Sequence, residues 1–285
     1  MMKIAKTIKS VRRLIKDARN AGKIIGFVPT MGALHIGHIS LIEAARKKCD
    51  FVVVSIFVNP TQFGEGEDFE KYPRPLDADL KICRKAGVDV VFAPTAKEMY
   101  GDENLTWVNV EKLTEPLCGQ YRPGHFRGVA TVCAKLFNIV LPDVAFFGQK
   151  DAQQAVVIKR MAADLNMPLK IVVCPTVRQP DGLAVSSRNQ YLTPVQKKDA
   201  TLLYKSLQKF RAMVEAGVRN VPEITAQMRK ILNSSPLIEI EYISIVDAET
   251  LEAIDRISGR VLVALAVRIG STRLIDNILL DVGKK

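Results

Sequence analysis

The sequence predicts an α/β protein in which a parallel-sheet domain, residues 1–177, precedes a smaller α+β domain, residues 178–285. Two observations predict this division. Up to residue 177, short apolar runs alternate with segments of helical periodicity, the order that gives a parallel sheet with right-handed crossovers. After that point the order changes to two helical segments followed by three strand-like segments, which is typical of a small α+β domain.

The first domain begins with basic and apolar residues whose spacing predicts an amphipathic helix over residues 8–19. An apolar run over 23–28 predicts the next strand, and the helical pattern after it is expected to end near Lys48. Residues 51–58 are almost all β-branched or aromatic, as in a strand covered on both faces of a parallel sheet. Strand and helix therefore alternate from the start.

The alternation continues beyond a surface loop. Residues 64–75 are rich in Gly, Pro and acidic side chains, which predicts a mobile loop. The other elements expected in this domain are a helix over 76–86, a strand over 89–92, a weak strand over 108–110, a polar loop over 119–128, a helix over 129–140, a strand over 144–147, a helix over 151–165 and a strand over 169–177.

The second domain begins with residues 178–189, which show neither helical nor strand periodicity. Thr193 and Gln196 form a capping box with Pro194 at the first helical position, so a long helix is expected there. A second helix is expected to begin at Val221. Strands are expected over 238–246, 261–267 and 272–280.

The composition is that of an ordinary globular protein: 48% of the 285 residues are hydrophobic and 25% are charged. The five cysteines are odd in number and never in a C-x-x-C pair, which predicts free thiols in the cytoplasm and argues against disulfides or a zinc site. No apolar run has the length of a membrane-spanning helix, and no signal-peptide core is present, so no membrane association is expected.

The net charge of +11 raises nucleic acid as a partner, because residues 1–48 hold eleven Lys or Arg against two Asp or Glu. These charges lie opposite an apolar face, as on a solvated surface helix, and no aromatic residues interleave with them for base stacking. We therefore expect small anionic substrates and no nucleic-acid partner.

One motif stands out: residues 29–38 read PTMGALHIGH and join the predicted strand to the next helix. A helix N-terminus carries free N–H groups and partial positive charge, and His35 and His38 share one face of it, so both rings can donate to phosphate oxygens. Gly32 and Gly37 are expected to let a nucleotide approach the backbone. By themselves the histidines leave phosphate binding, metal binding and no function open, but further metal ligands are scarce, which favours phosphate.

Other polar motifs follow other predicted strands, namely Asn59–Gln62, Gly148–Gln154 and the loop after Val177. The carboxyl ends of parallel strands meet at one edge of a sheet, so these motifs are expected to converge with the histidines. Lys150 can hold a phosphate, and Asp151 can accept ribose hydroxyls or cap a helix. The common nucleotide signatures G-x-x-x-x-G-K-[ST] and G-x-G-x-x-G are absent from the sequence.

The loop over residues 184–189 offers two hydroxyls and a guanidinium fork for phosphate, from Ser186, Ser187 and Arg188. A solvated polar loop is the alternative. A second basic cluster, whose role the sequence leaves open, contains Arg122, His125 and Arg127.

Six motifs in order carry a family resemblance across nearly the whole chain: PTMGALHIGH at 29–38, SIFVNPTQF at 55–63, YPRPLDAD at 72–79, RPGHFRGV at 122–129, FFGQKDAQQ at 146–154 and DGLAVSSRN at 181–189. Together they resemble the pantoate:beta-alanine ligases (pantothenate synthetases), within the nucleotidyltransferase and class I aminoacyl-tRNA synthetase superfamily.

The resemblance implies a Rossmann-like domain that binds ATP and pantoate, with a carboxyl-terminal lid domain. It also implies two steps: the pantoate carboxylate attacks the α-phosphorus of ATP and pyrophosphate leaves, then the amine of beta-alanine attacks the acyl carbon and AMP leaves. The catalytic residues it implies are His35, His38, Lys150 and Arg188. The residues it places at the nucleotide are Met31, Gly32, Ala33, Leu34, His35, Ile36, Gly37, His38, Gly148, Gln149, Lys150, Asp151, Val177, Val185, Ser186, Ser187 and Arg188.

For pantoate, the resemblance implies Met31, Gln62 and Gln154. ATP brings Mg2+, for which Asp79 is one candidate ligand. A homodimer is expected from the resemblance alone. Two alternatives remain at this point: a related nucleotidyltransferase that keeps its adenylylated product, and a basic RNA-binding protein.

Overall fold

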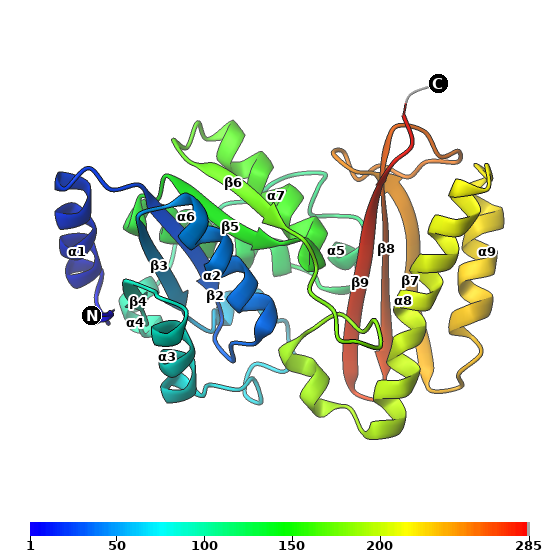
Figure 1. Ribbon diagram of the computed structural model, residues 1–285, viewed down its shortest axis with the longest axis horizontal. Coiled ribbons are helices and arrows are strands. Elements are labelled where there is room, and N and C mark those ends of the chain that lie inside the picture. The colour runs from blue at the N-terminus through cyan, green and yellow to red at the C-terminus, as the bar shows by residue number, and fades with distance from the viewer. Residues whose placement is uncertain (284–285) are drawn as a thin grey trace. The chain divides into compact units, whose positions relative to one another are not determined.

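The computed structural model describes residues 1–283, and the chain divides into two compact units whose elements are labelled in Figure 1. The first unit contains Met1–Thr114, Arg122–Gln149 and Gln154–Pro175. The second contains Glu115–Tyr121, Lys150–Gln153 and the chain from Thr176 onward.

The first unit is built on a six-stranded parallel sheet with strand order β1-β4-β3-β2-β5-β6. Its strands are β1 (Lys3–Ala5), β2 (Ile25–Thr30), β3 (Phe51–Ile56), β4 (Val90–Phe92), β5 (Val144–Gly148) and β6 (Lys170–Cys174). Its helices are α1 (Ile8–Asn20), α2 (Ile36–Lys48), α3 (Leu76–Lys85), α4 (Ala96–Tyr100), α6 (His125–Val140) and α7 (Ala152–Asp164), of which α7 begins in the second unit. The α/β class and the parallel sheet are confirmed.

Apolar side chains cover both faces of this sheet, which is why its strands have nearly continuous hydrophobic sequences. On one face Val28 belongs to a buried cluster with residues of α2 and α3. On the other face Phe27 meets the ring of Phe137 from α6 edge-on, with ring centroids 6.4 Å apart. Successive residues of β2 therefore bury into opposite layers, as the alternation of a strand requires.

Three local predictions were wrong. Residues 108–110 form no strand, because the N–H of Val108 donates to the hydroxyl of Thr131 (3.0 Å) instead of to a neighbouring strand. The polar stretch 119–128 is mostly helical: α5 (Cys118–Tyr121) lies at its start, and α6 begins at His125 after Gly124, whose φ of +78° suits glycine. β6 ends at Cys174 rather than at residue 177, because Pro175 has no N–H for the ladder.

One strand was missed by sequence reasoning. β1 has only three residues, two of which are exposed, so its periodicity is too short to detect. It pairs in parallel with β4 at the edge of the sheet, where Ala5 lies opposite Phe92.

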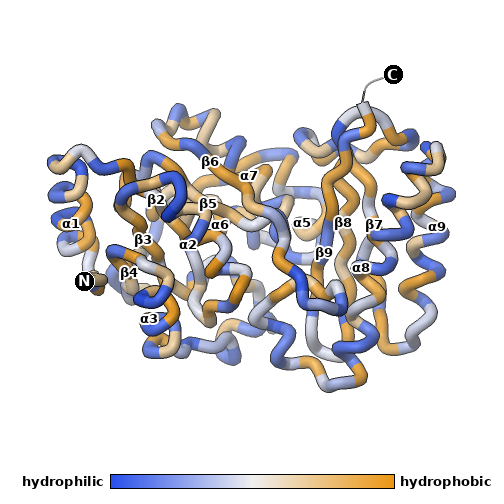
Figure 2. The backbone as a smooth tube through the Cα atoms, in the orientation of Figure 1, coloured by the Kyte–Doolittle hydropathy of each residue, from blue (hydrophilic) through white to orange (hydrophobic). Residues whose placement is uncertain are grey.

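The second unit packs two helices, α8 (Pro194–Glu215) and α9 (Val221–Leu232), on an antiparallel sheet of β7 (Ile238–Asp247), β8 (Arg260–Ile269) and β9 (Thr272–Asp281). The predicted capping box is present: Thr193 accepts from the N–H of Gln196, and Gln196 accepts from the N–H of Thr193. The central strand β8 is hydrophobic along most of its length in Figure 2, and its residues 261–267 are all buried. The α+β class expected of this part is confirmed.

All five cysteines are free and buried. Within residues 1–283, none of the helices is both long and apolar enough to cross a membrane.

Candidate active site at the carboxyl edge of the parallel sheet

Three strands deliver polar motifs to one edge of the first unit. β2 pairs with β3 on one side and with β5 on the other, all in parallel, so the segments after these strands emerge at the same edge. The chain thus leaves β2 at the position where the strand order reverses, which is where ligands bind in sheets of this type. The predicted convergence is confirmed for the segments after β2 and β3, whereas Lys150–Gln153 and the loop after Val177 belong to the second unit and their convergence stays a prediction.

The turn after β2 is held by a carboxylate from a distant helix. Gly32 and Ala33 both have left-handed backbone, with φ of +84° and +50°. Asp79 of α3 accepts from the N–H groups of Ala33 (2.9 Å) and Leu34 (2.7 Å), one on each oxygen. A Cβ on Gly32 would lie 3.0 Å from Asp79 Oδ2, a tight contact, and the positive φ at this position also favours glycine.

Asp79 is 1% exposed, and this burial raises the pKa of its carboxyl group, although the two backbone N–H bonds act in the opposite direction. The sequence suggested Asp79 as a magnesium ligand. Both of its oxygens instead bind the backbone of the turn, so the structure gives it a structural role.

The two histidines of the motif cap α2 and stack on each other. His35 Nδ1 accepts from the N–H of Gly37 (3.2 Å), and His38 Nδ1 accepts from the N–H of His35 (3.3 Å). The ring centroids are 4.1 Å apart. Because Nδ1 is the acceptor in each ring, the hydrogen of the neutral imidazole is on Nε2, and both rings can donate from that atom.

Gly37 favours this arrangement for a reason that the sequence did not indicate. A Cβ at position 37 would lie 3.0 Å from both Cε1 and Nδ1 of His35. The missing side chain therefore makes room for the ring of His35 over the first turn of α2, in addition to the expected room for a nucleotide.

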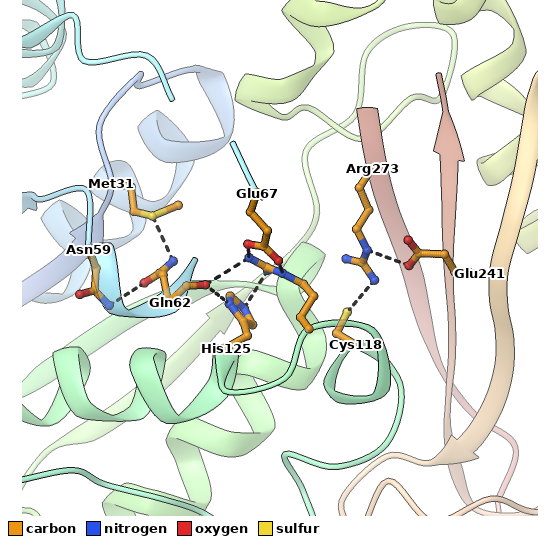
Figure 3. Close-up of polar contacts among 9 residues, drawn as sticks. Met31, Asn59, Gln62, Glu67, Cys118, His125, Glu241 and Arg273 are labelled. Atoms are coloured by element: carbon orange, nitrogen blue, oxygen red, sulfur yellow. Dashed lines mark hydrogen bonds and ion pairs between the residues drawn. The ribbon is translucent and has the colours of Figure 1, made fainter. Parts of the chain in front are cut away.

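A second cluster joins Met31, directly after β2, to Gln62, in the segment after β3; both residues were predicted to bind the acid substrate. Gln62 is 8% exposed, and its Nε2 lies 3.0 Å from the sulfur of Met31. Its Oε1 accepts from Asn59 Nδ2 at 3.1 Å (Figure 3). The structure thus brings together two of the three residues expected at pantoate.

The third of these residues, Gln154, is half-buried in the first turn of α7. No hydrogen bond among residues 1–283 joins it to Met31 or Gln62. Its role stays a prediction.

The basic cluster of the RPGHFRGV motif binds protein groups of the same unit. Arg122 donates to both oxygens of Glu67, at 2.7 and 2.5 Å, and His125 Nδ1 lies 2.8 Å from the backbone carbonyl oxygen of Gln62 (Figure 3). Burial would raise the pKa of Glu67, but the hydrogen bonds and positive charge of Arg122 outweigh it and hold that pKa below its usual value. Arg127 instead stacks on the ring of Trp107, 4.3 Å from its centroid.

The predicted mobile loop over residues 64–75 has more contacts than its polar composition suggests. Phe63 lies edge-on to Phe69 and Tyr72, with centroids 5.3 and 5.9 Å away, and Tyr72 is buried. Together with the ion pair of Glu67 and Arg122, these rings fasten the loop beside Gln62.

In the second unit, Lys150 and Asp151 lie in a 3₁₀ turn, Gln149–Asp151, and Lys150 Nζ is 3.4 Å from Asp151 Oδ1. The backbone carbonyl of Lys150 accepts from the side chain of Asn277 on β9 (2.8 Å). The second unit therefore fixes the main chain of Lys150 through a buried amide that no sequence motif indicated.

The loop over residues 178–189, which we call the SSRN loop, is also held by β9. Arg178 makes a bidentate ion pair with Asp276 of β9 (2.6 and 2.9 Å). Farther along, the N–H of Val185 donates to the carbonyl of Val177 (3.0 Å), and Ser186 Oγ accepts from the N–H of Arg188 (3.3 Å). The two valines expected at the nucleotide are therefore adjacent, and the predicted serine shapes the backbone that carries Arg188.

Buried polar side chains on β7 and β9 form a network that contacts the segment of residues 115–121 in the same unit. Arg273 donates to Glu241 (2.8 Å) and to the sulfur of Cys118 (3.5 Å), as Figure 3 shows. The same sulfur lies 3.1 Å from the hydroxyl of Tyr242. Neither Glu241 nor Arg273 belongs to a motif, so no sequence signal identified them.

Known proteins are similar to this chain over almost its whole length. The sequence profile of the pantoate-beta-alanine ligase family matches residues 3–279. The pantothenate synthetase of Acetivibrio thermocellus is 53% identical over 99% of this chain and 100% of its own, and that of Thermoanaerobacter pseudethanolicus is 54% identical over 98% of each.

Two solved structures have the same fold. The crystal structure of pantothenate synthetase from Thermus thermophilus superposes with a TM-score of 0.93 at 44% identity, over 97% of this chain and 99% of that one. The pantoate-beta-alanine ligase of Francisella tularensis, crystallised with beta-gamma ATP and beta-alanine, superposes with a TM-score of 0.80 at 39% identity, over 98% of each chain.

Proposed function

The chain belongs to the pantoate-beta-alanine ligase family, and from this we propose that it condenses pantoate with beta-alanine at the expense of ATP. The pantoate carboxylate attacks the α-phosphorus, pyrophosphate leaves, and a pantoyl adenylate forms. The amine of beta-alanine then attacks the acyl carbon, loses a proton, and AMP leaves with pantothenate as the product. The observation that best supports this chemistry is the pair of histidines that cap α2 directly after β2.

His35 and His38 are assigned to the phosphates of ATP. Negative charge shifts onto the α-phosphate oxygens and the leaving pyrophosphate during the first step, so donors that are already oriented stabilise the transition state more than the ground state. The backbone N–H groups hold Nδ1 of both rings, so neither ring can turn without losing a hydrogen bond. Each Nε2–H therefore has a fixed direction.

Lys150, Ser187 and Arg188 of the second unit are assigned to phosphate by the family resemblance. Lys150 supplies a point charge and Arg188 a planar fork, the two forms of cation that proteins use for phosphate. Asp276 and Asn277 of β9 support both elements, since one pairs with Arg178 at the start of the SSRN loop and the other holds the main chain of Lys150.

Met31 and Gln62 are assigned to pantoate, with Gln154 as a third contact. A neutral amide can donate to a carboxylate or hydroxyl without pairing so strongly that the carboxylate loses its nucleophilicity. The thioether of Met31 adds an apolar surface beside the amide of Gln62.

Magnesium is assigned to ATP itself, whose phosphate oxygens and waters are the ligands that Mg2+ prefers. No carboxylate of this chain is assigned to it. The cytoplasm is the proposed location, in keeping with five free thiols. The homodimer and the lid role of the second unit remain predictions, tested by the mass in solution and by X-ray scattering with and without ATP and pantoate.

One assay tests the reaction. Radiolabelled pyrophosphate should enter ATP only when pantoate is present, and AMP should accumulate only after beta-alanine is added. Pyrophosphate exchange that needs no pantoate would support a nucleotidyltransferase with another substrate. RNA binding that weakens steeply with salt, without exchange, would support the nucleic-acid alternative.

A further inference from the structure

A chain of hydrogen bonds links Gln62 to a tyrosine outside all six motifs. Tyr100, the last residue of α4, donates from its hydroxyl to Asn59 Oδ1 at 2.6 Å. The hydroxyl of Thr61 also reaches this oxygen, at 3.0 Å. On its other side, Asn59 Nδ2 donates to the backbone carbonyl of Gly128 (3.2 Å) and to Gln62 Oε1 (3.1 Å).

Two backbone groups identify which way the amide of Asn59 faces. The N–H of Thr61 can only donate, and it lies on the Oδ1 side at 3.4 Å. The carbonyl of Gly128 can only accept, and it lies on the Nδ2 side. A flipped Asn59 would place donor against donor on one side and acceptor against acceptor on the other. Asn59 is 1% exposed, so water cannot correct such a mismatch.

The orientation of Asn59 in turn sets that of Gln62. Because Asn59 presents N–H to Gln62, the oxygen of the Gln62 amide must face Asn59, and its Nε2 must point away, toward Met31. An amide with this orientation offers N–H donors to an approaching anion. The opposite orientation would offer oxygen lone pairs and repel a carboxylate.

Tyr100 is suited to hold the first hydrogen bond of this network in place. Its ring is half-buried beside Phe57, at a centroid distance of 6.3 Å, and Lys135 Nζ lies 5.2 Å from its centroid. Burial raises the pKa of Tyr100, so its hydroxyl stays protonated and remains a donor throughout the neutral range.

We propose that Tyr100 is a positioning residue that acts through Asn59 to hold the Gln62 amide with its N–H donors toward the carboxylate and hydroxyls of pantoate. The inference rests on the proposed function, because it takes pantoate as the ligand of Gln62. It predicts that losing one hydroxyl at Tyr100 weakens the use of pantoate and leaves the use of ATP intact.

The experiment compares Tyr100→Phe with the unmodified chain in pantoate-dependent pyrophosphate exchange. The KM for pantoate should rise about tenfold, the effect of one lost orienting hydrogen bond, while the KM for ATP stays within about twofold. Tyr204→Phe is the matched control: it makes the same chemical change on a ring that stacks on Arg178, 4.0 Å away, and should leave both KM values unchanged.

A double-mutant cycle separates positioning from general loosening of the fold. In a Gln62→Leu background, Tyr100→Phe should have no further effect on pantoate affinity, measured by titration calorimetry. An unchanged KM for pantoate in Tyr100→Phe, equal rises in both KM values, or additive effects in the cycle would overturn the inference. An unmodified chain without pantoate-dependent exchange would instead overturn the proposed function.

Discussion

Gly128 is the residue whose substitution tests most directly how the site is built. It lies in the first turn of α6, against the backbone of the segment that carries Gln62. A Cβ there would lie 2.2 Å from the carbonyl oxygen of Thr61 and 2.8 Å from Cα of Gln62, whereas ordinary contact begins at 3.4 Å. In Gly128→Ala, α6 and this segment must therefore separate by about 1.2 Å, the shortfall at the oxygen.

A displacement of about 1 Å at a catalytic site costs roughly 10²-fold in rate. Gly128→Ala should lower pantoate-dependent pyrophosphate exchange by about that factor, and should lower the free energy of unfolding by about 1–3 kcal/mol, as overpacking does. Exchange is measured at saturating ATP over a range of pantoate concentrations, and unfolding is measured in urea.

The matched control is Gly64→Ala, because a Cβ at position 64 has only ordinary contacts, at 3.8 Å and beyond, to Glu67. This variant should keep its rate and its stability within a few tenths of a kcal/mol. Exchange within twofold of the unmodified rate in Gly128→Ala would refute the argument that contact between α6 and the backbone positions Gln62.

Three further outcomes are expected. His38→Ala should lower kcat roughly 10²-fold, as the loss of a transition-state donor does, and a near-normal kcat would remove His38 from the mechanism. Asp276→Asn leaves the charge of the half-buried Arg178 without its buried partner and should cost about 3 kcal/mol in urea unfolding; a loss below about 1 kcal/mol would show that the pair is dispensable. Glu67→Gln should lose about 1.5–3 kcal/mol at pH 7. Because the folded pKa of Glu67 lies below its usual 4.5, its stabilisation is present above that value and fades as pH falls through the folded pKa, so unfolding curves of Glu67→Gln and the unmodified chain should draw together in acid. A gap that stays constant from pH 7 to pH 3 would contradict the pairing of Glu67 with Arg122.

Long elements with strong periodicity were predicted closely, and short or glycine-rich ones were not. α8 carries its own start signal in Thr193 and Gln196, and β3 carries a run of buried β-branched residues, so local chemistry defines both. The first turn of α6 looked like a loop because Gly124, His125 and Gly128, at its start and within it, are weak helix formers. In the structure it is helical, and Gly128 packs there against Thr61, a residue 67 positions earlier in the chain.

The sequence by itself determined the class of fold, the edge of the sheet where the polar motifs gather, and the residue types available to bind phosphate and an organic acid. Those follow from periodicity and from motifs a few residues long. Only the tertiary structure decided how each group is held: Asp79 binds the turn of Gly32 and Ala33, Gly37 makes room for the ring of His35, and Tyr100 reaches Asn59. These contacts join residues with no common pattern in the chain, because hydrogen-bond direction and close packing depend on which elements the fold brings together.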